Sequence, residues 1–143
     1  MTPAWLLNSM QTRFDSYDDI ARTCNDEQLQ AKPDIPAVKS IAEHLWCVVG
    51  ARESYAKAIS AGEWQGFSCS MASFNQEDFV EKMVESAQAV RDAVQGIEAP
   101  DVWDDTKREL LLTLHEHEVM HEGQLIRHMA SLGYDIPKSV TWY

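Results

Sequence analysis

Histidine is the residue of this sequence whose spacing most clearly suits chemistry. His117 and His121 are four residues apart in a segment with helical periodicity, so they lie about 40° apart around the helix and one turn apart along it. Both rings can therefore reach one ion. His44 shares the apolar face of an earlier helical segment with Val48 and Tyr55, and we expect its ring to point inward as well.

Burial of these rings is costly unless each polar nitrogen has a partner. One divalent ion can bind three neutral imidazoles and still leave a position for water or substrate, as in catalytic zinc sites. Nickel and ferrous iron also suit such ligands. The alternative is that each histidine is a core residue that binds a backbone carbonyl or a water molecule. The sequence therefore predicts either one metal site at His44, His117 and His121 or three hydrogen-bonded core histidines.

Charged and thiol side chains flank these histidines, and three of them are candidate catalytic residues. Glu118 and Glu122 are each either a base, a partner for a histidine N–H, or a solvated helix charge. Arg52, two turns after His44, either anchors a substrate carboxylate through its guanidinium or serves as an ion-pair or surface residue. Cys47, one turn after His44, either approaches the ion or packs as a small hydrophobic residue.

Two known metal motifs overlap the histidine pair. His117 to His121 reads HExxH, the zincin pattern, in which Glu118 would be the general base. The metzincin extension is absent, because Gln124 and Arg127 stand where its Gly and His would be. Glu118 and His121 also match one Glu-x-x-His pair of a di-iron site, but the second pair is missing. Both interpretations are therefore disfavoured.

Four helical segments are predicted to position these residues, and no strand is predicted. They run from an N-cap at Thr2 to about Cys24, from Ser40 to about Gly62, from Asn75 to about Gly96, and from about Val102 to Leu132. Pro3 suits the first helical position, and Ser40-Ile-Ala-Glu43 is a capping box. We expect residues 25–39 to be a linker and residues 134–143 to pack back on the helices. One apolar stripe per helix predicts an all-α four-helix bundle, with residues 1–143 in a single domain.

The composition of the chain indicates which binding partners and which cellular compartment to expect. The formal net charge of −11 disfavours binding to nucleic acid and to anionic membranes. The three cysteines are odd in number and contain no CxxC pair, and the first residues lack the basic segment of a secretory signal. We therefore expect a cytoplasmic protein with reduced thiols.

The chain resembles the DinB-like (DinB/YfiT) metalloprotein family over nearly its whole length. The resemblance rests on Ser40-Ile-Ala-Glu-His44, on His117-Glu-Val-Met-His121-Glu-Gly-Gln-Leu125, and on Leu132-Gly-Tyr-Asp-Ile-Pro137. It implies a four-helix bundle of up-down-down-up connection. It also implies one divalent ion held by His44, His117 and His121. Many members carry Arg where this chain has Glu122.

Characterised relatives in this family are transferases and isomerases that use low-molecular-weight thiols, and members are often homodimers. The resemblance thus implies a metal-dependent thiol S-transferase that acts on small electrophilic substrates. Three alternatives stay open: a non-catalytic metal-binding or sensor module, a metal-dependent hydrolase, and a metal-free helical interaction domain.

Overall fold

Helices account for the regular structure in the computed structural model, which describes residues 4–97 and 103–140. The elements are α1 (Ala4–Thr23), α2 (Asp26–Gln30), α3 (Ile41–Ala61), α4 (Gln76–Gln95), α5 (Asp105–Ser131) and the 3-10 turn η2 (Lys138–Val140). These described ranges contain no strand. The predicted all-α class is therefore confirmed.

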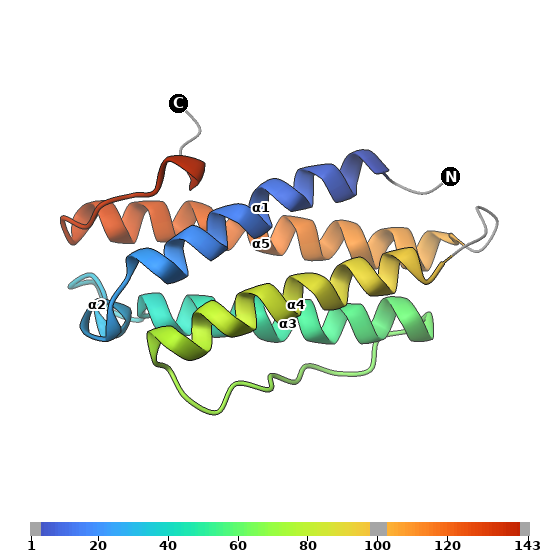
Figure 1. Cartoon of the computed structure of the whole chain (residues 1–143), viewed down its shortest axis with the longest axis horizontal. Helices are drawn as coiled ribbons and strands as arrows, with labels where there is room; N and C mark the ends of the chain where they lie inside the picture. The colour runs from blue at the N-terminus through green and yellow to red at the C-terminus, as the bar shows by residue number, and fades with distance from the viewer. Residues whose placement is uncertain (1–3, 98–102, 141–143) are drawn as a thin grey trace.

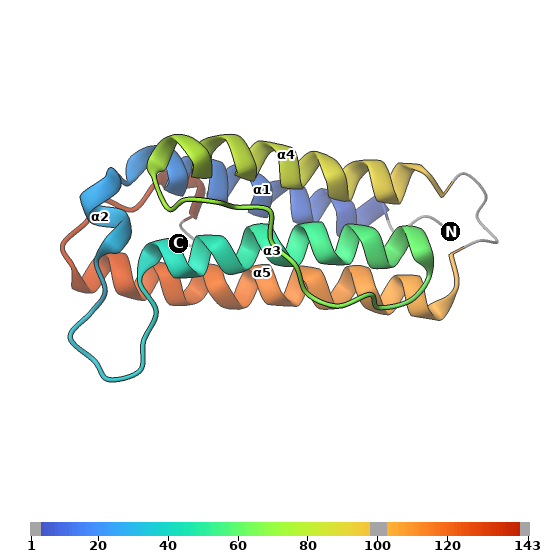
Figure 2. The ribbon, with the colours of Figure 1, turned by 90° about the horizontal axis from the view of Figure 1, so that it is seen from below.

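The four long helices form a bundle with an unusual connection. Figures 1 and 2 show that α1 and α5 run in one direction along the long axis and that α3 and α4 run in the other. The segment of residues 62–75 returns along the bundle so that α4 can start beside the start of α3. Helix α3 packs against α4 and α5, and α1 packs against the same two helices. The up-down-down-up topology is confirmed.

The ends of α3 follow from local chemistry. The Ser40 hydroxyl accepts a hydrogen bond from the Glu43 N–H at 3.1 Å, and the Ser40 N–H donates to the Glu43 carboxylate at 2.6 Å. This is the predicted capping box, which satisfies two N–H groups that a helix start leaves open. At the other end, Gly62 has a φ of 81°, a left-handed conformation that glycine adopts without steric cost.

The predicted starts of the first and last helices lie partly outside the described residues. Thr2, Pro3 and Val102 are not described. Helix α5 takes Asp104 as its N-cap, and the Asp104 carboxylate accepts from the Lys107 N–H at 2.9 Å.

The predicted linker of residues 25–39 contains a short helix that sequence analysis missed. Asn25 and Gln28 form a second capping box at the start of α2, and Leu29 is fully buried. The segment of residues 31–41 is pinned at the point where its two ends meet, because the Ile41 N–H donates a hydrogen bond to the Ala31 carbonyl at 3.2 Å. This pinned segment leads directly into α3.

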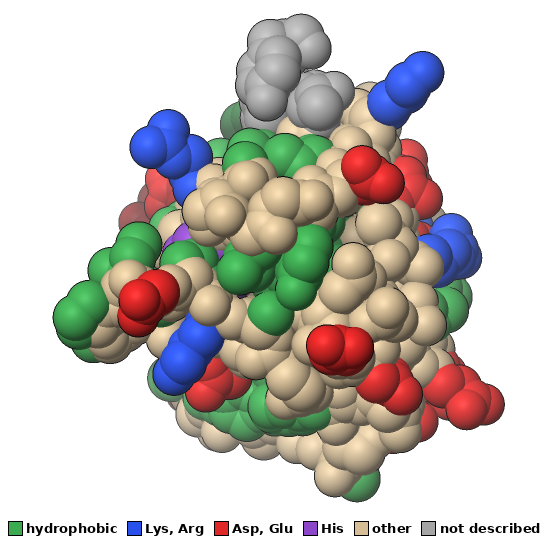
Figure 3. All heavy atoms as spheres, turned by 90° about the vertical axis from the view of Figure 1, so that its left-hand side faces the viewer, with side chains coloured by type: hydrophobic (Ala, Val, Ile, Leu, Met, Phe, Trp, Pro, Cys, Tyr) green, Lys and Arg blue, Asp and Glu red, His purple; other side chains and the backbone are tan. Residues whose placement is uncertain are grey.

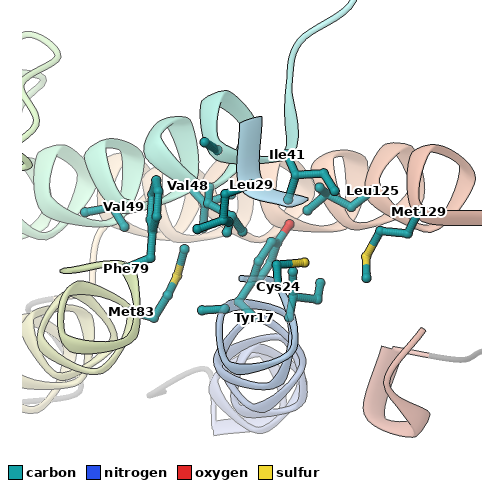
Figure 4. Close-up of a cluster of buried hydrophobic side chains, with 14 of the residues drawn as sticks. Tyr17, Cys24, Leu29, Ile41, Val48, Val49, Phe79, Met83, Leu125 and Met129 are labelled. Carbon is teal, nitrogen blue, oxygen red and sulfur yellow. The ribbon is translucent and has the colours of Figure 1, made fainter. Parts of the chain in front are cut away.

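Side chains from all four long helices meet in a hydrophobic cluster at the α2 end of the bundle (Figure 4). Tyr17, Val48, Phe79 and Leu125 are fully buried there. The tail packs against the same cluster through Val140, and Ser16 donates to the Ser139 carbonyl at 2.8 Å. The prediction that the tail packs back is confirmed for residues 134–140. None of the described helices is both long enough and apolar enough to cross a membrane.

Candidate metal centre

The histidines are presented by two neighbouring antiparallel helices. The capping box fixes where α3 begins, and His44 lies in the first turns of that helix. His117 and His121 lie in α5, which packs along α3. His44 and His121 are each 3% exposed, and His117 is half-buried. Part of a histidine surface is visible from this end of the bundle (Figure 3).

The three rings form a contiguous row. His44 Nδ1 lies 2.8 Å from His121 Nδ1, and His121 Nε2 lies 3.2 Å from His117 Nε2. The His121 ring is therefore in the middle, with one nitrogen facing each neighbour. A neutral imidazole has a single N–H, so His121 donates in at most one of these two contacts.

Burial keeps these rings neutral. Desolvation, helped by the positive Lys39 and by neighbouring rings, lowers the pKa of His121 to about 3 and that of His44 to about 4. Desolvation lowers the pKa of His117 as well. A neutral imidazole is the form that binds a metal ion, so the electrostatics of the site suit ligation.

A thiol completes the group of donor atoms. Cys47 Sγ lies 3.5 Å from His117 Nε2, and donor atoms of Cys47, His117 and His121 all lie within 4.8 Å of one another. This is a possible metal site. His44 adjoins it through His121, and the buried His44 Nε2 and His117 Nδ1 atoms have no hydrogen-bond partner among the described residues. The orphaned His44 Nε2 is thus available to an ion, whereas His117 Nδ1 lies on the other side of its ring from the Nε2 atom that faces His121.

The spacing of the nitrogens fits such an ion. Two imidazole nitrogens bound to a tetrahedral zinc at about 2.05 Å are separated by about 3.3 Å, and the two Nε2 atoms of His117 and His121 are 3.2 Å apart. The predicted set of His44, His117 and His121 differs from the compact donor group in one member. His44 faces the opposite nitrogen of His121 from the one that His117 faces.

The acidic neighbours are not solvated helix charges. Glu118 and Glu122 are fully buried. Glu118 accepts from Arg52 Nε at 2.5 Å and from Nη2 at 3.2 Å. Glu122 pairs with Arg13 at 2.6 Å. The structure therefore engages both carboxylates with arginines, and Arg52, also fully buried, has its guanidinium on Glu118.

A pocket opens beside the row of rings, with a volume of about 390 Å³. It is lined by Ala37, Val38, Lys39, His44, Cys47, His117, Met120, His121, Gln124 and His128. Among the residues that the structure describes, the lining contains no Asp or Glu, although the chain has 23. His128 stands next to His44, with ring centroids 5.0 Å apart, so this end of the pocket is a cluster of imidazoles with one lysine.

Sequence reasoning missed the partner of Glu122. Arg13 lies between Met10 and Tyr17 on the apolar stripe of α1 and is 5% exposed. A charged residue at a stripe position is the signal that could have indicated a buried ion pair. Which acidic residue it meets depends on the packing of α1 against α5, which local sequence does not encode.

Comparison with known families gives a match over nearly the whole chain. Residues 2–141 match the family model described as the DinB family. No curated protein matches the chain.

Proposed function

The chain belongs to the DinB family, and from this premise and the geometry of the cluster we propose that it binds one divalent metal ion between α3 and α5 and uses it for thiol transfer. His117 and His121 are the two ligands from α5, and His44 is the third by the ligand pattern that the family resemblance implies. The carrying observation is the 3.2 Å separation of the His117 and His121 Nε2 atoms. Zinc, nickel and iron all suit these ligands.

The surroundings favour thiolate chemistry over hydrolysis. A bound divalent ion would lower the pKa of a thiol that binds to it and would hold the sulfur as the nucleophilic thiolate. Transfer to an electrophile then needs no separate base. Hydrolysis of the HExxH type needs a free carboxylate at the site, and Glu118 is held by Arg52. The position of Glu118 therefore counts against a metal-dependent hydrolase.

The chain's own residues bind and orient the reactants. Val38 and Met120 offer apolar contact, and Gln124 offers an amide to polar groups in the pocket. Lys39 is the lone lysine or arginine among the described lining residues, and its ammonium group favours a thiol or an electrophile that carries a carboxylate. We propose a small-molecule substrate of this kind. Its identity, a homodimeric state, a cytoplasmic location and the exclusion of nucleic acid and membranes stay predictions.

The test of the metal site is elemental analysis of untagged protein purified without chelator. We expect about one ion per chain, and loss of most of it in His117→Ala and in His121→Ala. His115→Ala is the matched control, because His115 lies on the same helix but hydrogen-bonds to Ser9 at 2.8 Å. Full metal content in both ligand variants would contradict the proposal.

The test of thiol transfer is a panel of low-molecular-weight thiols with an electrophilic aryl halide. We expect turnover that disappears with the metal and a preference for carboxylate-bearing thiols that weakens in Lys39→Ala. Bound metal without turnover for any thiol would instead favour the non-catalytic module.

A further inference from the structure

Cys47 differs from the other two cysteines in what its sulfur faces. Cys24 belongs to the hydrophobic cluster and Cys69 packs against it. Cys47 is in neither hydrophobic cluster of the described residues. Its Sγ lies 3.5 Å from His117 Nε2 and lines the imidazole pocket. Cys47 therefore does not fit the alternative of a small core hydrophobe.

We propose that Cys47 is itself a ligand of the ion, so that the chain supplies its own thiolate at the position that a thiol cosubstrate would otherwise take. This inference rests on the proposed function. It adds a resting state in which protein ligands occupy every position on the ion and none is open to substrate. Two observations carry it. The first is the distance from Cys47 Sγ to His117 Nε2, and the second is the unpartnered Nε2 atom of the buried His44 ring.

The sulfur has the spacing of a ligand. A nitrogen at about 2.05 Å and a sulfur at about 2.3 Å from a tetrahedral zinc are about 3.6 Å apart. The separation of Cys47 Sγ from His117 Nε2 is 3.5 Å. The third side of this triangle, from Cys47 Sγ to the His121 donor nitrogen, is no longer than 4.8 Å, so the three donor atoms surround one point at which the proposed ion would meet two nitrogens and one sulfur.

His44 offers a fourth donor to the same pocket. It is 3% exposed, and its Nε2 atom has no partner among the described residues. His44 and Cys47 lie three residues apart on one face of α3, so both face α5. With His44 as the third histidine ligand of the proposed function, α3 and α5 would each supply two ligands, and four protein ligands are the closed form of a zinc site rather than the open catalytic form.

Entry of a cosubstrate thiol is then a ligand exchange. If Cys47 holds the ion together with His117 and His121, a cosubstrate thiol would replace it there, and the proton released by the cosubstrate would pass to the Cys47 sulfur. Charge and protons balance, and no oxidant is required. The half-buried position of Cys47 at the pocket gives the incoming thiol access.

Cobalt substitution tests this without an activity assay. Metal-free, untagged protein is titrated with Co²⁺ in a thiol-free reductant. Wild type and Cys69→Ser, the matched control with another half-buried thiol, should show a near-ultraviolet sulfur-to-cobalt charge-transfer band. Cys47→Ser should lose that band, keep the visible bands of tetrahedral cobalt, and bind Co²⁺ at least about tenfold more weakly.

The outcomes separate the two proposals. A wild-type protein that binds one Co²⁺ without the charge-transfer band overturns the Cys47 inference and leaves the metal site intact. Failure to bind any Co²⁺ overturns the proposed function itself. X-ray absorption of the zinc-loaded wild type requires no variant, and we expect a sulfur at about 2.3 Å. A first shell of nitrogen and oxygen alone would also overturn the inference.

Added 2-mercaptoethanol distinguishes the resting states. In Cys47→Ser or Cys47→Ala loaded with Co²⁺, the charge-transfer band should appear at about tenfold lower 2-mercaptoethanol than is needed to alter the wild-type spectrum. Equal concentrations for wild type and variants would contradict an internal thiolate.

Discussion

Arg52 and Glu118 form a fully buried ion pair that joins the middle of α3 to α5, next to the His117 ligand candidate. Arg52 Nε lies 2.5 Å from Glu118 Oε1, and both side chains have no exposed surface. Arg52 Nη1 also donates to the Met83 carbonyl in α4 at 3.1 Å. On the α1 side, the guanidinium lies 4.6 Å from the centroid of the Phe14 ring. All four long helices therefore meet at this arginine.

Removing one member of this pair should destabilise the bundle strongly. Arg52→Met leaves the Glu118 carboxylate buried without its cation, and we expect a loss of about 3–5 kcal/mol in the free energy of unfolding, measured with urea. The double variant Arg52→Met with Glu118→Leu should recover most of that loss. As a control, Arg108→Ala breaks an exposed pair with Asp105 and should cost at most about 0.5 kcal/mol. A single-variant loss below about 1 kcal/mol would contradict the prediction.

The metal-free protein should lose stability as the pH falls. The folded-state pKa values of His44 and His121 are about 4 and about 3, below the ordinary value of 6.5. The unfolded chain therefore takes up protons below pH 6.5 that the folded chain does not. Their contribution is fully present above pH 6.5 and is lost between pH 6.5 and about 3. Each proton gives a slope of about 1.4 kcal/mol per pH unit.

Urea unfolding at pH 7, 6 and 5 in the presence of chelator measures this slope. His121→Asn removes one of the rings whose pKa is lowered in the folded state and should flatten this slope. The same slope in wild type and variant would show that His121 is not protected from protonation.

Metal removal should lower the melting temperature. An ion at 100 times its dissociation constant adds about 2.7 kcal/mol to the stability of the folded state, which for a chain of this size corresponds to roughly 5–10 °C. Calorimetry with zinc and with chelator measures the difference. His117→Ala should abolish it and His115→Ala should retain it. An equal shift in both variants would indicate binding elsewhere.

The effects of substitutions at Gly50 and at Phe67, which lies in the segment of residues 62–75, should be coupled in the free energy of unfolding. A Cβ at residue 50 would collide with the Phe67 ring and lie 3.0 Å from Cys69 Cβ. In the wild-type background, Gly50→Ala should therefore be neutral or destabilising. In the Phe67→Ala background it should stabilise by up to about 1 kcal/mol, because alanine is the better helix former. A double-mutant cycle by urea unfolding checks this, and additive effects would contradict the contact.

The features predicted from sequence are those with local signals. The start of α3 follows from Ser40 and Glu43, three residues apart, and the joint placement of His117 and His121 follows from helical spacing. The up-down-down-up connection came from the family resemblance, which the comparison confirms. Helix α2 was not predicted, because Pro33 and Pro36 are typical of a linker. Asn25 and Gln28 carry a weaker capping signal for the start of this helix.

The features that could not be predicted are contacts between distant segments. Arg52 and Glu118 are 66 residues apart in sequence, and Cys47 and His117 are 70 apart. Their meeting depends on the rotation of α3 relative to α5, which hydrophobic periodicity fixes only to within the width of a stripe. The sequence therefore indicated candidate residues but not which charges are paired or which sulfur faces the rings.

The pinned segment between Ala31 and Ile41 has a consequence for how this protein can diversify. Ala37, Val38 and Lys39 contribute one wall of the pocket, yet they lie within a segment whose two ends are tied together by a backbone hydrogen bond. Substitutions in that wall should leave the start of α3 in place, and with it the row of histidine rings. Substitutions at Ala37, Val38 and Lys39 should therefore change which molecules enter the pocket without moving the candidate metal site behind it.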